Sequence, residues 1–166
     1  MTQNSTEIQH NKSLIAWLLT GCILVFIMVV VGGITRLTHS GLSMTDWHLV
    51  TDTFPPMTDS KWQEEFEEYK QFPEYQIINK HNNFTLDDYK SIYFWEWFHR
   101  FIGRIIGLVF IIPFVYFLIT KKINKKTFKE CLLLLFMGAL QGFFSWYMVK
   151  SGLIDRPDVS HYRLAL

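Results

Sequence analysis

Three long apolar runs, separated by polar connections, dominate the pattern along the chain. The first, residues 14–34, holds 21 consecutive positions without a charged side chain. At a rise of 1.5 Å per residue, such a run crosses a hydrocarbon core about 30 Å thick. Residues 92–119 and 131–149 form the other two runs, the first broken by charges and the second mainly by Gln141. The pattern predicts an all-α membrane protein with three complete transmembrane helices.

Charged residues in the connections predict the orientation. Residues 120–130 carry five lysines, which by the positive-inside rule places this short loop in the cytoplasm. Residues 35–91 hold ten acidic side chains against five basic ones, which suits the outer side. We therefore expect residues 1–13 to be a cytoplasmic N-terminus and residues 35–91 a large outer loop. The net charge of +1 gives no indication of a nucleic-acid partner.

The outer loop contains a predicted short amphipathic helix at residues 60–71. Its sequence favours Ser60 and Gln63 as a capping box, and three aromatic side chains share one face. We expect this helix to pack as a lid on the spanning helices. A second capping box, Thr85 with Asp88, predicts that the second long helix begins near residue 86 and continues to about residue 119. That helix would contain Pro113, and we expect a kink there.

The C-terminal residues indicate a fourth helix. After an outer connection at residues 150–158, residues 159–166 resemble the first turns of another spanning helix. A helix cannot end in lipid after two turns, because its last carbonyl groups would lack partners. We therefore expect the chain to be part of a longer protein, with three complete helices and the start of a fourth.

The segment "FWEWFHRFIGRIIG", residues 94–107, places several charges inside the second apolar run. Each arginine at the centre of a spanning helix costs about 2.5–3.5 kcal/mol on insertion scales, so these charges need a functional reason. Arg104 borders a stripe of residues at spacings of three and four: Glu96, His99, Arg100, Gly103 and Gly107. Imidazole ligates iron, arginines pair with propionates, and glycines let a flat macrocycle approach the backbone. The stripe therefore suits heme.

Other interpretations of the stripe remain open. His99 alone would also fit a hydrogen-bonded structural role, and Gly103 with Gly107 would also fit ordinary helix packing. A di-iron carboxylate site is disfavoured because the first and third helices contain no carboxylate. A zinc site is disfavoured because the other histidines show no ligand spacing.

Six segments, in this order and spacing, resemble heme A synthase: "GGITRLTHSGLSMTDW", "FPPM", "YKQFPEYQIIN", "FWEWFHRFIGRIIG", "QGFFSWYMVKSGL" and "VSHYRLAL". The likeness covers nearly everything from about residue 30 onward. Within this family, the chain resembles the branch whose first outer loop lacks a cysteine pair, because residues 35–91 contain no cysteine. The resemblance implies eight spanning helices in two related four-helix halves, each with two histidines at its outer side. It also implies oxidation of a ring methyl group of heme O to a formyl group, giving heme A for terminal oxidases.

The resemblance assigns roles to individual residues. His99 corresponds to the first histidine of the N-terminal half and would ligate or face the heme iron. Glu96 corresponds to the glutamate one turn earlier and would manage protons or orient intermediates. Propionate contacts are expected from arginines, and Gln141 and Trp146 would line the pocket or serve packing. The candidate arginines are Arg36, Arg100, Arg104 and Arg163, and Gly103 would lie against the macrocycle.

The resemblance also implies cofactors, partners and a location. Heme b is expected mainly in the C-terminal half, and heme O is the substrate. Because the second histidine of this half should follow Leu166, we do not expect the chain to be active alone. Lipid, heme O synthase, an electron donor and a second copy of the chain are the candidate partners. The expected location is the bacterial inner membrane. A non-enzymatic, heme-binding electron-transfer subunit is the alternative function.

Overall fold

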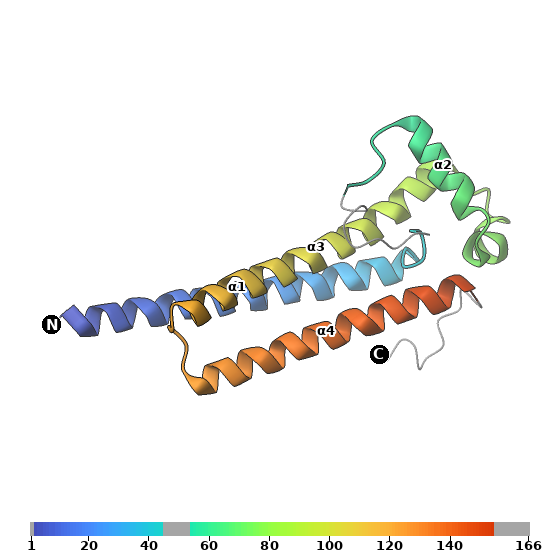
Figure 1. The fold of residues 1–166 in the computed structure, drawn as a ribbon. Helices are drawn as coiled ribbons and strands as arrows, with labels where there is room; N and C mark the ends of the chain where they lie inside the picture. The colour runs from blue at the N-terminus through green and yellow to red at the C-terminus, as the bar shows by residue number, and fades with distance from the viewer. Residues whose placement is uncertain (1, 45–53, 155–166) are drawn as a thin grey trace. The chain divides into compact units, whose positions relative to one another are not determined.

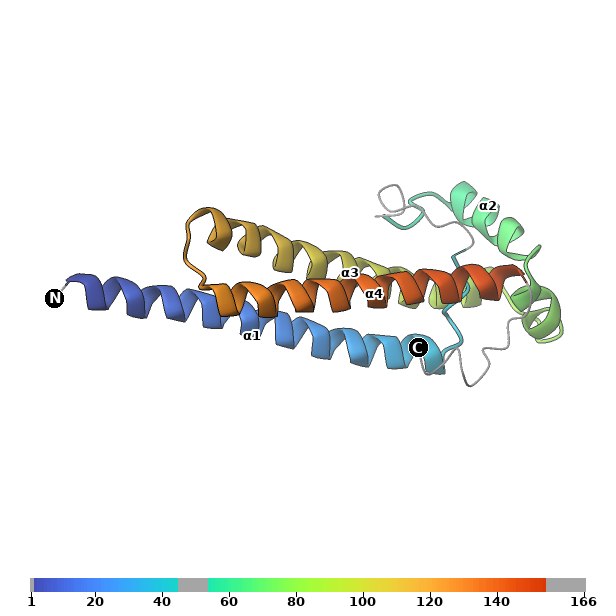
Figure 2. The same ribbon diagram turned by 60° about the horizontal axis from the view of Figure 1, so that its bottom comes forward.

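The computed structural model describes residues 2–44 and 54–154, and within them every regular element is a helix (Figures 1 and 2). In chain order these are α1 (Thr2–Leu37), α2 (Asp59–Tyr69), the short π-helix η2 (Tyr75–Asn79), α3 (Leu86–Ile119) and α4 (Lys125–Ile154). Among these described residues, three helical stretches are long and apolar enough to cross a membrane: Lys12–Leu37, Leu86–Ile119 and Lys125–Lys150. The expected all-α membrane class is confirmed, and the orientation stays a prediction.

The two predicted helix starts have different outcomes. α3 begins after Thr85 as expected, since Asp88 Oδ2 accepts hydrogen bonds from Thr85 N (2.9 Å) and Thr85 Oγ1 (2.7 Å). The Ser60–Gln63 capping box is wrong. Thr58 caps α2 instead, with extended backbone and its Oγ1 accepting from Lys61 N at 3.4 Å. This earlier start places an acidic residue in the first turn, where the helix dipole favours negative charge.

Some expectations cannot be compared with the structure. The predicted fourth helix at residues 159–166, with Arg163, lies outside the described residues.

The predicted spanning segments can be compared with the helices of the structure. Segments 14–34, 92–119 and 131–149 fall inside α1, α3 and α4, which extend beyond them at one or both ends.

The chain divides into two compact units, and α1, α3 and α4 each contribute to both. Unit 1 comprises Met1–Val30 with Ile102–Leu140, and unit 2 comprises Val31–Phe101 with Gln141–Leu166. Among the described residues, Trp17, Phe114, Phe117 and Cys131 form the buried core of unit 1. Cys131 is buried as its apolar surroundings suggest, whereas Cys22 is exposed.

One hydrogen bond in unit 1 follows directly from a proline. Pro113 lies inside α3 and has no N–H, so it cannot bond the carbonyl four residues earlier, that of Val109. The indole Nε1 of Trp17 donates to this carbonyl at 2.8 Å. The Trp17 ring also packs on Phe110 and Phe117, with ring centroids 5.2 Å and 5.5 Å apart. The side chain from α1 thus satisfies the backbone group that the proline leaves open in α3.

Unit 2 has an aromatic core beneath α2. The buried residues Met44, Phe66, Tyr69, Tyr89 and Tyr93 form one cluster that joins α2, α3 and the segment after α1. The ring centroids of Tyr69 and Tyr89 are 4.9 Å apart, and those of Phe66 and Tyr89 are 5.2 Å apart. α2 therefore packs its aromatic face on α3, as the sequence predicts for the lid.

Candidate functional site

A cap at the C-terminal end of α1 sets the path of the segment that follows this helix. His39 adopts a left-handed backbone conformation (φ 52°), and Ser40 N donates back to Thr35 O at 2.9 Å, across the last turn of α1. This cap reverses the chain and leads it into the four residues Gly41–Met44. Ser40, Ser43 and Met44 are each at most 3 % exposed. A buried segment without regular structure needs partners for its backbone N–H groups.

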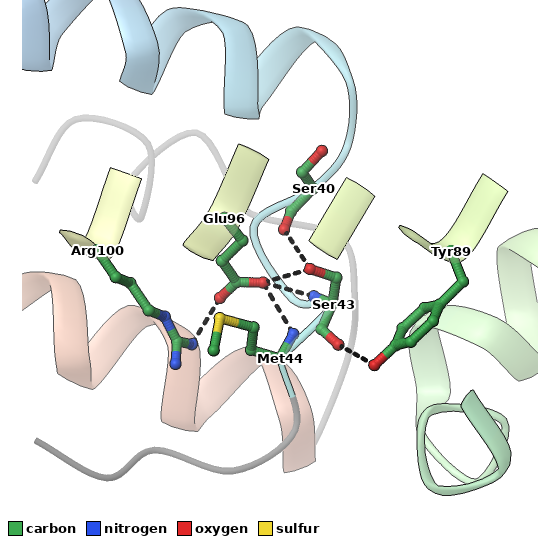
Figure 3. A network of polar contacts seen from close by, with 6 residues as sticks. All are labelled: Ser40, Ser43, Met44, Tyr89, Glu96 and Arg100. Carbon is green, nitrogen blue, oxygen red and sulfur yellow. Dashed lines mark hydrogen bonds and ion pairs between the residues drawn. The ribbon is translucent and has the colours of Figure 1, made fainter. Parts of the chain in front are cut away.

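Glu96 of α3 supplies those partners (Figure 3). Its Oε2 accepts from Ser43 N at 2.7 Å, Ser43 Oγ at 2.8 Å and Met44 N at 2.9 Å. Its Oε1 accepts from a guanidinium nitrogen of Arg100, one turn further along α3, at 2.5 Å. Glu96 is 3 % exposed as a whole residue, so its carboxylate is bonded to protein donors in place of water. Hydrogen bonds to an ionised group are about twice as strong as neutral ones.

A second contact joins the same segment to α3. The hydroxyl of Tyr89, two turns before Glu96, donates to the carbonyl oxygen of Ser43 at 3.2 Å (Figure 3). Tyr89 is fully buried. Ser43 is thus held on both its N–H and its C=O side by residues of one helix. The segment after α1 is fixed to α3 at two separate turns.

The imidazole of His99 lies against α1. A Cβ placed on Gly32 would lie 3.2 Å from His99 Nε2, tighter than most real contacts, so any other residue here would require the ring to shift by a few tenths of an ångström. His99 is half-buried. Within the part of the chain that the structure describes, neither of its nitrogens has a hydrogen-bond partner. An imidazole in this state can still ligate a metal.

The remaining predicted site residues are distributed as follows. Arg36 is exposed on α1, and Arg100 is engaged by Glu96. Gly103 and Arg104 belong to unit 1, where a Cβ on Gly103 would make ordinary contact with Met28 at 3.5 Å. A Cβ on Gly107 would meet nothing within 4 Å, so this position makes no close helix contact.

Gln141 and Trp146, the two candidate site residues on α4, form no hydrogen bond or ion pair with Glu96 or His99 in the described residues. Gln141 is exposed and Trp146 is half-buried, with the Lys150 ammonium 5.0 Å from its ring centroid.

The donor set around His99 fits a heme better than a bare ion. Among the described residues, no three His, Cys, Asp or Glu side chains gather as a metal site. A bare zinc ion needs three or four protein ligands, whereas heme iron already has ring nitrogens and needs one imidazole from a helix. A single accessible imidazole beside a glycine backbone meets that requirement.

Sequence reasoning missed a second buried carboxyl group, Glu74. It is 6 % exposed and accepts a hydrogen bond from Tyr69 Oη at 3.3 Å, and Asn79 Nδ2 donates to the same hydroxyl at 2.8 Å. Burial, and secondarily the negative charge of Glu96, raises the pKa of Glu74 to about 8. Burial likewise raises the pKa of Tyr69. The signal available in the sequence was the string "FPEY", in which an acid follows a helix-ending proline among aromatic residues.

The chain is similar to one known protein family and to several curated proteins. The family described as cytochrome oxidase assembly protein matches residues 15–166. The chain is 77% identical over 158 residues to a heme A synthase of Flavobacterium psychrophilum, covering 95% of this chain and 47% of that protein. For a heme A synthase of Flavobacterium johnsoniae the identity is 73%, covering 95% and 46%. For one of Parvibaculum lavamentivorans it is 54%, covering 96% and 46%.

The chain spans about half the length of the curated relatives it matches. No solved structure matches it. The family match covers nearly the whole chain, and the relatives agree in name and in the region matched. The chain therefore belongs to the cytochrome oxidase assembly protein family, and its helices are those of a multi-pass membrane protein.

Proposed function

We propose that this chain forms the N-terminal half of a heme A synthase, in which His99 faces the iron of heme O. The observation that carries the proposal is the half-buried imidazole of His99, held against Gly32 without a hydrogen-bond partner in the described residues. The names of the relatives supply the reaction class. Replacing a ring methyl group by a formyl group removes four electrons from the substrate and adds one oxygen atom.

The residues of this chain would bind and orient the substrate. The His99 imidazole would fix the macrocycle at the outer part of α3, and the Gly32 backbone would leave room for its plane. Stacked aromatic side chains on α3 would exclude water: Phe94 on Phe98, with ring centroids 5.8 Å apart, and Trp97 on Phe101, 5.3 Å apart. Heme b, bound mainly outside this chain, would supply one-electron transfer.

Arg36 is the best-supported candidate for an anionic arm of the macrocycle. It lies four residues after Gly32 on α1, so both share one helix face. Its side chain is exposed, whereas the Arg100 guanidinium already pairs with Glu96. A forked guanidinium matches a propionate carboxylate with two parallel hydrogen bonds.

The test uses the native polypeptide, expressed from its complete gene in cells without another synthase. His99→Ala should abolish heme A in extracted pigments and change the visible spectrum of the purified protein. His81→Ala, which removes an exposed histidine of the outer loop, should change neither. Unchanged heme A in His99→Ala would exclude this role of the imidazole. Bound heme without heme A in the unaltered protein would favour the electron-transfer alternative.

A further inference from the structure

Glu96 is the polar centre of unit 2, yet its geometry does not suit a proton carrier. A carboxylate offers about four acceptor positions. Four donors contact it: Ser43 N, Ser43 Oγ and Met44 N on Oε2, and Arg100 on Oε1. Adding a proton to this buried group would remove the negative charge that strengthens all four bonds. The arrangement is that of an anchor.

We propose that Glu96 is a positioning residue, which fastens the segment after α1 to α3 and thereby holds Gly32 of α1 against the His99 imidazole. The fastening itself is independent of any ligand. Its consequence for heme rests on the proposed function of His99.

Glu96 is linked to the end of α1 through Ser43. Ser43 Oγ donates to Glu96 Oε2 and lies 3.1 Å from the carbonyl oxygen of Ser40 (Figure 3). Ser43 N, which also bonds Glu96, lies 3.4 Å from the same Ser40 oxygen. The carboxylate thus orders the turn that closes α1.

That turn is linked to His99 through the last turns of α1. Ser40 N donates to Thr35 O at 2.9 Å. The hydroxyl of Thr35 lies within hydrogen-bond reach of two carbonyl oxygens of α1, Val31 O at 2.8 Å and Gly32 O at 3.0 Å. Gly32 is the residue whose backbone lies against the imidazole. Because Glu96 and His99 are one turn apart on α3, these hydrogen bonds and the packing of Gly32 against the imidazole together close a ring through both helices. Cutting the ring at Glu96 frees the end of α1 to move away from His99.

The choice of substitution separates positioning from proton transfer. Glu96→Gln keeps the length of the side chain and one oxygen that still accepts from the Ser43 and Met44 amides. Glu96→Asp keeps the acid but is one methylene shorter, so it cannot reach those amides and Arg100 together. A positioning role therefore predicts that Gln preserves more function than Asp, whereas a proton carrier predicts the reverse order.

The experiment uses the native polypeptide in lipid nanodiscs, with two measurements that need no heme. Hydrogen–deuterium exchange, read by mass spectrometry, reports the protection of the Ser43 and Met44 amides. Reaction with diethyl pyrocarbonate reports the accessibility of the His99 imidazole. A third measurement, the visible spectrum and the heme A yield, reports the consequence for the site. Glu67→Gln, which removes an exposed carboxylate on α2, is the matched control.

We expect Glu96→Ala to lower amide protection about tenfold or more and to raise the reaction rate of His99 several-fold. Ser43→Ala, which removes one of three contacts on Oε2 and risks less unfolding, should shift both in the same direction by less. Glu96→Gln, which keeps an acceptor for the two amides but not the pair with Arg100, should retain more of the protection, the heme spectrum and the heme A yield than Glu96→Asp. Glu96→Asp should lose them, and Glu67→Gln should match the unaltered protein.

Several results would overturn the positioning role. These are unchanged protection in Glu96→Ala, unchanged His99 reactivity once protection is lost, or a heme A yield higher in Glu96→Asp than in Glu96→Gln. A polypeptide that binds no heme would instead overturn the proposed function. In that case amide exchange and His99 labelling still decide whether Glu96 holds the two helices together.

Discussion

The two units use the same three long helices but bury different chemistry. In unit 1 the buried side chains are aromatic or otherwise apolar: Trp17, Ile102, Phe114, Phe117 and Cys131. Every buried polar or charged side chain among the described residues lies in unit 2: Thr35, Ser40, Ser43, Glu74 and Glu96. Apart from the hydrogen bond from Trp17 to the Val109 carbonyl, α1, α3 and α4 therefore pack through apolar side chains in the described part of unit 1.

The difference teaches where this chain requires one defined geometry. Burying a charge costs free energy unless the charge is paired and hydrogen-bonded. A buried ion pair therefore does not by itself show that the fold is more stable. Polar contacts have strict distances and angles, whereas apolar contacts tolerate shifts. Unit 2 holds the candidate ligand His99, and its surroundings are fixed by directional bonds. We infer that accuracy of position matters more there than in unit 1.

The largest expected effect breaks the polar anchor from its cationic side. Arg100→Met leaves the Glu96 carboxylate buried without its charge partner, which should cost about 3–5 kcal/mol of unfolding free energy. Denaturant titration in detergent micelles measures this loss. Adding Glu96→Gln to Arg100→Met should restore part of it, because no uncompensated charge remains. Lys70→Met, which breaks the exposed pair with Glu67, should have no measurable effect. An equally small loss for Arg100→Met would remove the contrast between the two units.

A smaller effect concerns the second buried acid of unit 2. Glu74 has a pKa raised from 4.5 to about 8, so the folded chain holds this proton more tightly than the unfolded chain. Its contribution is complete below about pH 4.5 and is lost as pH rises toward about 8. Glu74→Gln should therefore flatten the fall of the thermal midpoint between pH 5 and pH 8. Equal slopes in both proteins would show that Glu74 is ionised when folded.

The smallest effect sharpens the comparison from unit 1. Trp17→Phe removes the donor to the Val109 carbonyl and should cost about 1–3 kcal/mol. In a Pro113→Ala background the helix regains its own N–H for that carbonyl, so the same substitution should cost less. Unfolding of the four proteins of this double-mutant cycle gives the coupling free energy. Coupling near zero would mean that apolar packing alone holds the Trp17 side chain.

The helical segments and one helix start followed from local features of the sequence. Long apolar runs predict spanning helices because the cost of exposing backbone in lipid is summed over many residues. The Thr85–Asp88 cap of α3 was predictable because both partners lie within one turn. At α2, two hydroxyl residues two positions apart compete for the cap, and only the folded chain shows that Thr58 provides it.

The partners of the site residues were harder to predict. Glu96 bonds backbone amides of Ser43 and Met44, and every non-proline residue carries such an amide, so the sequence has no signal for the pairing. The Glu96–Arg100 pair, at a spacing of four, had a local signal. The assignment of that arginine to a propionate stays a prediction. Apolar runs also give no signal for the exposure of Cys22, because they do not show which helix face meets other helices.

The proline in α3 also bears on how the helices find one another in the bilayer. Helices inserted separately can in principle pair at many axial offsets, because lipid tails and apolar side chains are equivalent surroundings. Pro113 leaves the Val109 carbonyl without its usual partner, and the Trp17 indole reaches it in only one alignment. A slip by one turn would leave both polar groups in hydrocarbon, at several kcal/mol each. The carbonyl left open by Pro113 and the indole of Trp17 therefore favour one axial register of α1 against α3.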